Sequence, residues 1–163
     1  MTHVLVRFRR PVEADQPVLV ELVDDWWGRR MQGQLPRLWF RHFTGTSLVA
    51  ESPGGSIDGF VVGFVSPDHP DQAYLHLIGV APGKRRRGLG RALVERFGAV
   101  AAERGATRLS TIAWPGDPVA LEFLRATGFE VETQPGLQRL YGTPAHTDWD
   151  RQGDDQVMLT RPI

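Results

Sequence analysis

The sequence contains no cysteine, and this absence excludes disulfide bonds, thiolate metal sites and a cysteine nucleophile. Histidine and the acidic residues show no spacing typical of a metal site, so we expect no metal. No apolar run approaches the ~18–20 residues that a membrane-spanning helix needs. The N-terminal residues carry charges within their apolar stretch and no cleavage site, so we expect no signal peptide. The resulting prediction is a cytoplasmic protein with no membrane partner.

The chain also lacks net charge, because Lys+Arg and Asp+Glu number 19 each. No overall field attracts nucleic acid, and we expect no nucleic-acid partner. Charge is local instead, with a basic segment at 83–91 and an acidic one at 148–155. The 163 residues, 41% hydrophobic and 23% charged, suit one globular domain over 1–163.

Hydrophobic periodicity and turn residues indicate an α+β protein. Strands are predicted at 3–10, 46–52, 59–67, 73–82, 107–114, 129–132 and 155–163. Helices are predicted at 15–27 with Asp15 as N-cap, at 34–43, at 89–104, and at 117–128 as a capped helix. The segment 137–154 reads as loop. This order favours a mixed sheet covered by helices.

A glycine-containing basic segment, Arg85-Arg86-Arg87-Gly88-Leu89-Gly90, lies between a predicted strand and a predicted helix. A helix N-terminus has unpaired N–H groups, and glycines let a phosphate approach them closely. Two familiar phosphate loops do not fit: no Ser or Thr follows the Gly-Lys pair, and Leu93 stands where a dinucleotide fingerprint needs glycine. The alternative is a capped helix with a solvated basic turn.

The segment resembles the acyl-CoA loop of the GNAT superfamily of N-acetyltransferases, whose pattern is Arg/Gln-x-x-Gly-x-Gly/Ala. Arg85, Gly88 and Gly90 match it. The preceding strand end LIGVAP (77–82) and the late helix ALEFLRATGF (120–129) are also similar to that family. The resemblance implies the GNAT fold, a central mixed sheet of about seven strands flanked by about four helices. It also implies transfer of an acetyl group from acetyl-CoA, with no metal, to a primary amine of a small molecule or peptide.

The same resemblance implies which residues hold the cofactor. Amides around Arg86 to Arg91 would bind the pyrophosphate, and the backbone of Val80 would pair with the pantetheine arm and donate to the oxyanion. Gly79 suits a bulge that would admit the arm. The predicted cofactor-binding residues are Ile78, Val80, Arg85, Arg86, Arg87, Gly88, Leu89, Gly90, Arg91 and Phe123.

His76 is the predicted base that takes the amine proton, since histidine titrates near neutral pH. Strand alternation places it on the same face as Val80. The stretch YLHLIGV is similar to a strand of arylalkylamine acetyltransferases, where histidines at the positions of Tyr74 and His76 serve as bases. The alternative is a partly buried histidine bonded to backbone.

The group that protonates the departing thiolate is open. Many GNAT relatives place a Tyr where this sequence has Leu124. Tyr141 or Tyr74 could substitute, or the thiolate leaves as the anion. A third reading is a catalytically silent acyl-CoA-binding regulator on the same fold.

The acceptor amine is expected between two acidic and aromatic walls. One is DDWWGRR (24–30), where Asp25 and Trp27 would face the acceptor. Alternatively this stretch is only a helix end, with Trp26 in the core and Asp24 solvated. The other wall is the acidic late loop. The predicted substrate-binding residues are Asp25, Trp27, Tyr74, His146 and Trp149, and a homodimer is possible.

Overall fold

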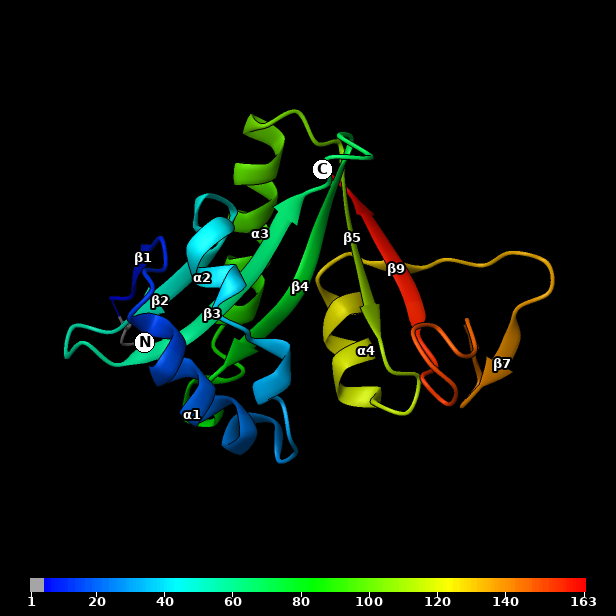
Figure 1. Ribbon diagram of the computed structural model, residues 1–163, viewed down its shortest axis with the longest axis horizontal. Coiled ribbons are helices and arrows are strands. Elements are labelled where there is room, and N and C mark those ends of the chain that lie inside the picture. Colours follow the sequence, from blue (N-terminus) through cyan, green and yellow to red (C-terminus); the bar gives the residue numbers. More distant parts are fainter. Residues whose placement is uncertain (1–4) are drawn as a thin grey trace.

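The computed structural model describes residues 5–163 and has a mixed sheet with helices on both faces (Figure 1). The sheet order is β1-β2-β3-β4-β5-β9-β6. Its strands are β1 Arg7–Arg9, β2 Leu48–Glu51, β3 Ile57–Val65, β4 Gln72–Val80, β5 Arg108–Ala113, β6 Glu130–Val131 and β9 Val157–Pro162. The α-helices are α1 Asp15–Trp27, α2 Leu38–His42, α3 Leu89–Glu103 and α4 Pro118–Ala126. Short 3₁₀ turns are η1 Gln32–Gln34, η2 Thr44–Thr46 and η3 Pro82–Lys84.

The predicted α+β class, the seven-stranded mixed sheet and the four helices are confirmed. The predicted strand at 3–10 begins outside the described residues, and within them β1 covers only Arg7–Arg9. The predicted cap of the last helix is also confirmed, since the carboxylate of Asp117 accepts from the Ala120 N–H at 3.0 Å.

The predicted loop at 137–154 instead contains a hairpin, formed by β7 Gln138–Leu140 and β8 Thr143–Ala145. Its turn residues Tyr141 and Gly142 have φ angles of 52° and 80°. Two consecutive positive φ angles are typical of the tight turns that match the twist of a hairpin. Because each strand has three residues, hydrophobic alternation is too short to detect, which explains the wrong prediction.

Two hydrophobic clusters lie on opposite faces of the sheet. The first joins α3 and α4 to the strands and includes Leu93, Phe97 and Leu121. The second lies under α1 and α2 and includes Leu19, Trp26 and Phe60. Trp26 is therefore a core residue, as expected from the alternative in which DDWWGRR is only a helix end. Within residues 5–163, no helix combines the length and the hydropathy needed to cross a membrane.

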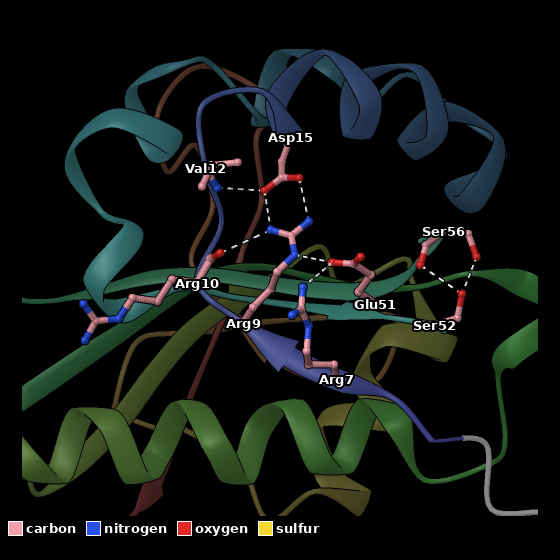
Figure 2. Close-up of polar contacts among 8 residues, drawn as sticks. All are labelled: Arg7, Arg9, Arg10, Val12, Asp15, Glu51, Ser52 and Ser56. Atoms are coloured by element: carbon pink, nitrogen blue, oxygen red, sulfur yellow. Dashed lines mark hydrogen bonds and ion pairs between the residues drawn. The ribbon is translucent and has the colours of Figure 1, made fainter. Parts of the chain in front are cut away.

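The start of α1 is fixed to the sheet by a buried ionic network (Figure 2). Both carboxylate oxygens of Asp15 accept from Arg9, at 2.8 and 2.9 Å, and Arg9 also bonds Glu51. Burial opposes ionisation of Asp15, but the bonds from Arg9 and the Val12 N–H outweigh it and lower its pKa. The predicted N-cap role of Asp15 is wrong: Ala14 occupies that position, and Asp15 binds Arg9 instead.

The sheet opens between its two central strands. Parallel pairing of β4 with β5 covers only residues 72–74 and 108–110, although β4 runs on to Val80. The Thr111 hydroxyl donates to the Leu75 carbonyl at 2.8 Å just beyond the last pair. In Figure 1 the two strands meet at the top of the view and separate toward the bottom. One edge of β4 is thereby left without a strand partner.

Candidate active site

The open edge of β4 presents backbone polar groups. The Ala81 N–H donates to the Asp58 carbonyl at 2.8 Å, so Val80 opposes Gly59 as a non-hydrogen-bonded pair. In such a pair the N–H and C=O of each residue point away from the partner strand. Ile78, two residues earlier, has the same orientation. The backbone groups of Ile78 and Val80 therefore face the gap toward β5, where an extended ligand can add as a strand.

A β-bulge interrupts β4 at His76, not at Gly79 as the sequence analysis predicts. Val62 opposes Leu77 and Gly63 opposes Leu75, so His76 is the extra residue. A bulge breaks the alternation of side chains between the two faces. His76 consequently lies on the face of α1 and α2, against Trp39, whereas Val80 packs with the α3–α4 cluster. The prediction that the two residues share a face is wrong for this reason.

His76 is held by a ring and a carbonyl. Its imidazole stacks on Trp39 with centroids 4.2 Å apart and an interplanar angle of 12°. Its Nε2 lies 2.6 Å from the Gln34 carbonyl oxygen. Because a carbonyl only accepts, Nε2 carries the hydrogen and Nδ1 carries the lone pair. Burial lowers the pKa of His76 from its usual value, against the opposing effect of the Gln34 bond, and so favours the neutral ring.

Trp39 and Gln34 hold the His76 ring in place, although neither is among the functional residues predicted from the sequence. Trp39 lies on the apolar face of a predicted helix, and that position is equally typical of core. No sequence signal marks a main-chain carbonyl such as that of Gln34. Asp24 fixes the segment between α1 and Gln34 that positions this carbonyl. Its carboxylate accepts from the N–H groups of Met31 and Gln32 at 2.7 and 3.1 Å. Asp24 is thus a structural residue.

Trp27 lies directly against Gly79 of β4. A Cβ built on Gly79 would be 2.5 Å from the Trp27 ring, so glycine is required there for the indole to approach the strand. The ring is half-buried and also contacts Phe60, with centroids 6.2 Å apart. Trp27 therefore borders the open edge of β4, on the same face as His76.

Asp25 does not share that wall, contrary to the prediction. Two residues apart on an α-helix lie about 200° apart around its axis. Since Trp27 points to the sheet, Asp25 points away from it, and its side chain is exposed. The helix predicted over 15–27 already implies that the side chains of Asp25 and Trp27 point in opposite directions.

Substitutions at these two positions are expected to have different effects. For the acetyl transfer that the resemblance implies, Trp27→Ala removes contact area at the open edge of β4 and should raise the acceptor KM about tenfold, the equivalent of ~1.4 kcal/mol. Asp25→Asn is the matched control on the same helix and should leave the acceptor KM unchanged. Steady-state kinetics with saturating acetyl-CoA measures both. A raised KM in Asp25→Asn with wild-type kinetics in Trp27→Ala would reverse the assignment.

The residues predicted as the second wall of the acceptor groove are aromatic and acidic. Tyr74 contacts Phe64 with ring centroids 5.5 Å apart. Burial, with a smaller contribution from the charge of Asp150, raises the pKa of Tyr74 to about 12. The acidic late segment thus approaches β4 through Asp150. In the same segment His146 pairs with Gln156 through the backbone, and its ring meets Trp149 edge-on at 5.2 Å.

Tyr141 lies elsewhere. It is 77% exposed at the tip of the β7–β8 hairpin, edge-on to Trp114. Figure 1 shows this hairpin at the side of the molecule opposite α1. Tyr141 instead lines a 680 Å³ cavity along α4 with Pro118 and Glu122. This position does not support the predicted acid role. Leu124, at the family's Tyr position, is buried in the core.

The glycine loop forms an anion cradle at the start of α3. Gly88 is the N-cap with φ 85°, and the first helical bond runs from the Ala92 N–H to the Gly88 carbonyl at 3.0 Å. The N–H groups of residues 89–91 therefore have no helical acceptor. Among the described residues no side chain caps them. A Cβ on Gly88 would meet nothing within 4 Å, so the space beside this residue is open.

The arginines of the loop divide into two kinds. Arg85 donates to the carbonyls of Val80 and Trp26, and Arg91 donates to the Ala126 carbonyl at 2.7 Å. These two guanidinium groups hold the loop against α1 and α4, so their side chains are already engaged within the protein, and cofactor binding by these residues stays a prediction. Arg86 and Arg87 are exposed.

Gly90 is buried and joins the loop to α4. Its Cβ position is 2.7 Å from the Phe123 ring, so only glycine lets α3 begin this close to α4. Phe123 thereby lies beside the anion cradle, as the sequence analysis predicts. The open strand edge, the bulge and the glycine-bounded helix start together form one candidate site for an extended ligand that carries an anionic group.

Residues 12–129 match the acetyltransferase (GNAT) family, and the chain belongs to this family. It is 35% identical over 102 residues, 60% of this chain and 52% of the relative, to an L-2,4-diaminobutyric acid acetyltransferase of Nocardia farcinica. The chain spans about half the length of the curated relatives that it matches, 52% and 46% for two of them.

Solved structures show the same fold. Diaminobutyrate acetyltransferase from Paenibacillus lautus, in complex with L-2,4-diaminobutyric acid and coenzyme A, superposes with a TM-score of 0.72 at 22% identity over 98% of this chain and 96% of that one. A phosphinothricin acetyltransferase from Sinorhizobium meliloti in complex with AcCoA gives 0.69 at 18% identity, over 97% and 88%.

Proposed function

We propose that this chain is an acetyl-CoA-dependent N-acetyltransferase that acts on a primary amine of a small molecule. The observation that carries the proposal is the open edge of β4, where the backbone of Ile78 and Val80 faces a gap that leads from the α3 cradle. Family membership supports the activity. Complexes of structural neighbours with coenzyme A or AcCoA support the co-substrate.

The chain's own groups fit acetyl-CoA. The pyrophosphate accepts from the N–H groups of residues 89–91, and Arg86 and Arg87 add positive charge. Each charge-assisted bond contributes roughly 1.5–3 kcal/mol, so several amides suffice to hold a dianion. The pantetheine arm pairs with Ile78 and Val80 as an added strand, which brings the thioester to the bulged part of β4.

In the proposed transfer, the amine nitrogen forms a bond to the acetyl carbonyl carbon and the bond from that carbon to sulfur breaks. His76 accepts the amine proton at Nδ1, the ring nitrogen not engaged by Gln34. The Val80 N–H donates to the carbonyl oxygen as its negative charge develops. The side chains of His76 and Val80 lie on opposite faces of the sheet, but the Val80 N–H lies in the plane of the sheet. The amine can therefore approach the thioester from the face of His76.

The thiolate leaves as the anion in this proposal. Tyr141 is remote, and Leu124 has no proton to give. Tyr74 has a pKa of about 12, which makes it a weak acid against a thiolate whose own pKa lies far lower. Tyr74 and Asp150 act instead as the groove wall toward the cationic acceptor, beside His146 and Trp149.

The proposed acceptor is a small diamino acid such as L-2,4-diaminobutyric acid. Several relatives carry that name, and the acidic and aromatic groove suits a molecule with two ammonium groups. Acetyl-CoA is made and used inside the cell, so we place the activity in the cytoplasm. Exposed Tyr141, Val119 and Trp114 on the hairpin side support a homodimer formed through that side.

Free-thiol release with a panel of amines tests the proposal. L-2,4-diaminobutyrate is expected to give a kcat/KM at least ten times that of L-lysine, phenethylamine or a short peptide, because several relatives carry its name and Asp150 lies near Tyr74. Thiol release with every amine equal to that without acceptor would favour the silent acyl-CoA-binding regulator.

A further inference from the structure

A second cavity lies beneath α1, on a different side of the helix from Trp27. Its volume is 460 Å³, and its walls come from α1, the β2–β3 turn and the β4–α3 connection. The α1 residues that line it are Val18, Leu22 and Trp26. None of the residues assigned to the acceptor groove contributes to these walls.

Asp58 is the unusual residue of this cavity. It is 2% exposed, and its Oδ2 has no hydrogen-bond partner among residues 5–163. The nearest cation is the Lys84 ammonium at 4.0 Å, beyond hydrogen-bond distance. A buried carboxylate oxygen without a donor is strongly unfavourable. A donor supplied by a ligand would remove that penalty.

The backbone explains why Asp58 faces this cavity. The β2–β3 register shifts between Ala50 and Glu51, so Asp58 is the extra residue of a bulge in β3. Gly59, the next residue, faces Leu89 and Leu93 of α3. Asp58 therefore lies on the opposite face, under α1.

Neighbouring cations only partly offset the carboxylates around Asp58, because Arg9 and Lys84 face three of them, Asp15, Glu51 and Asp58. The Arg9 guanidinium also borders the cavity, but it is already bonded to Asp15 and Glu51 (Figure 2). Those two carboxylates already balance the charge of Arg9. Lys84 remains as the one cation near Asp58 in the described structure, and it lies 4.0 Å away. The cavity therefore favours a positively charged group.

The remaining walls are apolar. Leu22, Trp26 and Ile57 border the same space as Asp58. A short hydrocarbon chain placed against them is removed from water, at roughly 0.8 kcal/mol per CH₂ group. A ligand that fits therefore has a positive end and a short apolar body.

We propose that this cavity is a second binding site, for a small molecule with a primary ammonium group on a short alkyl chain. The ammonium donates to Asp58 Oδ2, and the alkyl chain contacts Leu22, Trp26 and Ile57. The site is distinct from the acceptor groove of the proposed function and does not depend on acetyl transfer.

An NMR titration of the ¹⁵N-labelled full chain with n-butylammonium, without acetyl-CoA, tests the proposal. We expect saturable shifts at the amides of Ser56, Ile57, Asp58 and Ala81, with a Kd near the millimolar range. Asp58→Asn should weaken binding at these amides at least tenfold, and 1-butanol should bind at least tenfold more weakly than n-butylammonium. Asp25→Asn is the matched control, since it removes an exposed carboxylate of α1 that does not line the cavity, and it should bind as the wild type does.

A second variant keeps the test decisive if Asp58→Asn does not fold. Leu22→Trp fills the cavity without changing charge and should abolish the same shifts. Shifts confined to the acceptor groove, at Tyr74 and His76, would overturn the proposal. So would equal affinities of wild type and Asp58→Asn, or of n-butylammonium and 1-butanol. Because turnover is not measured here, failure of this site leaves the acetyltransferase proposal standing, and the reverse also holds.

Discussion

His76→Ala is expected to lower kcat about a hundredfold at neutral pH while acetyl-CoA affinity stays near that of the wild type. The variant loses the Nδ1 lone pair that takes the amine proton, but no group that binds the cofactor. The loss should shrink at high pH, where the amine arrives unprotonated. Initial rates from pH 6 to 10 and calorimetric titration with acetyl-CoA measure the two quantities.

The pH dependence of kcat should follow the ionisation of His76. Burial lowers the pKa of His76 from its usual value, which favours the base form of the ring at neutral pH. The acid limb of the wild-type kcat profile should therefore lie below the pH at which a solvent-exposed histidine titrates, and it should be absent in the variant. Wild-type turnover across the whole range would remove His76 from the mechanism.

Two further variants separate chemistry from structure. His76→Gln retains a side-chain N–H that can donate to the Gln34 carbonyl, but it has no basic nitrogen. It should fold normally and lose kcat as His76→Ala does. Recovery of wild-type kcat in His76→Gln would show that the hydrogen bond, not the base, matters. His42 is exposed on α2, and His42→Ala should keep wild-type kinetics.

Gly88→Asp is expected to abolish acetyl-CoA binding, with affinity at least a hundredfold weaker. The new carboxylate lies in front of the unpaired N–H groups of residues 89–91 and can accept from them itself. It therefore competes with the pyrophosphate for the same donors and repels it by charge. Calorimetric titration with acetyl-CoA measures the loss, and equal affinities of wild type and variant would refute the loop assignment.

Gly88→Ala is the control for backbone strain. Gly88 has φ 85°, a conformation that costs a residue with a Cβ about 1–2 kcal/mol. Both substitutions carry this strain, but only Asp adds the charge. Gly88→Ala should melt at nearly the same temperature as Gly88→Asp. It should keep acetyl-CoA affinity within about tenfold of the wild type, because backbone strain that displaces one of several amide donors costs about one hydrogen bond.

The sequence by itself determined the helices, most strands of the main sheet and the position of the glycine loop, because these depend on residues close together in the chain. The 3.6-residue period of α1 placed Trp26 in the core. Gly88 and Gly90 between a strand and a helix marked the anion cradle, since the start of a helix and its unpaired amides are local features. The same helical period separates Asp25 from Trp27, although the sequence analysis assigns them to one wall.

The tertiary structure alone decided the faces and partners of the functional side chains. The bulge at His76 depends on the register of β4 against β3, and no local pattern reports that register. Arg85 donates to the Trp26 carbonyl, a group far away in the sequence. Asp58 looks like an ordinary turn-flanking carboxylate in the sequence, yet packing of α1 over a second bulge buries it without a hydrogen-bond partner for Oδ2 in the described structure. Such contacts arise only when distant segments meet.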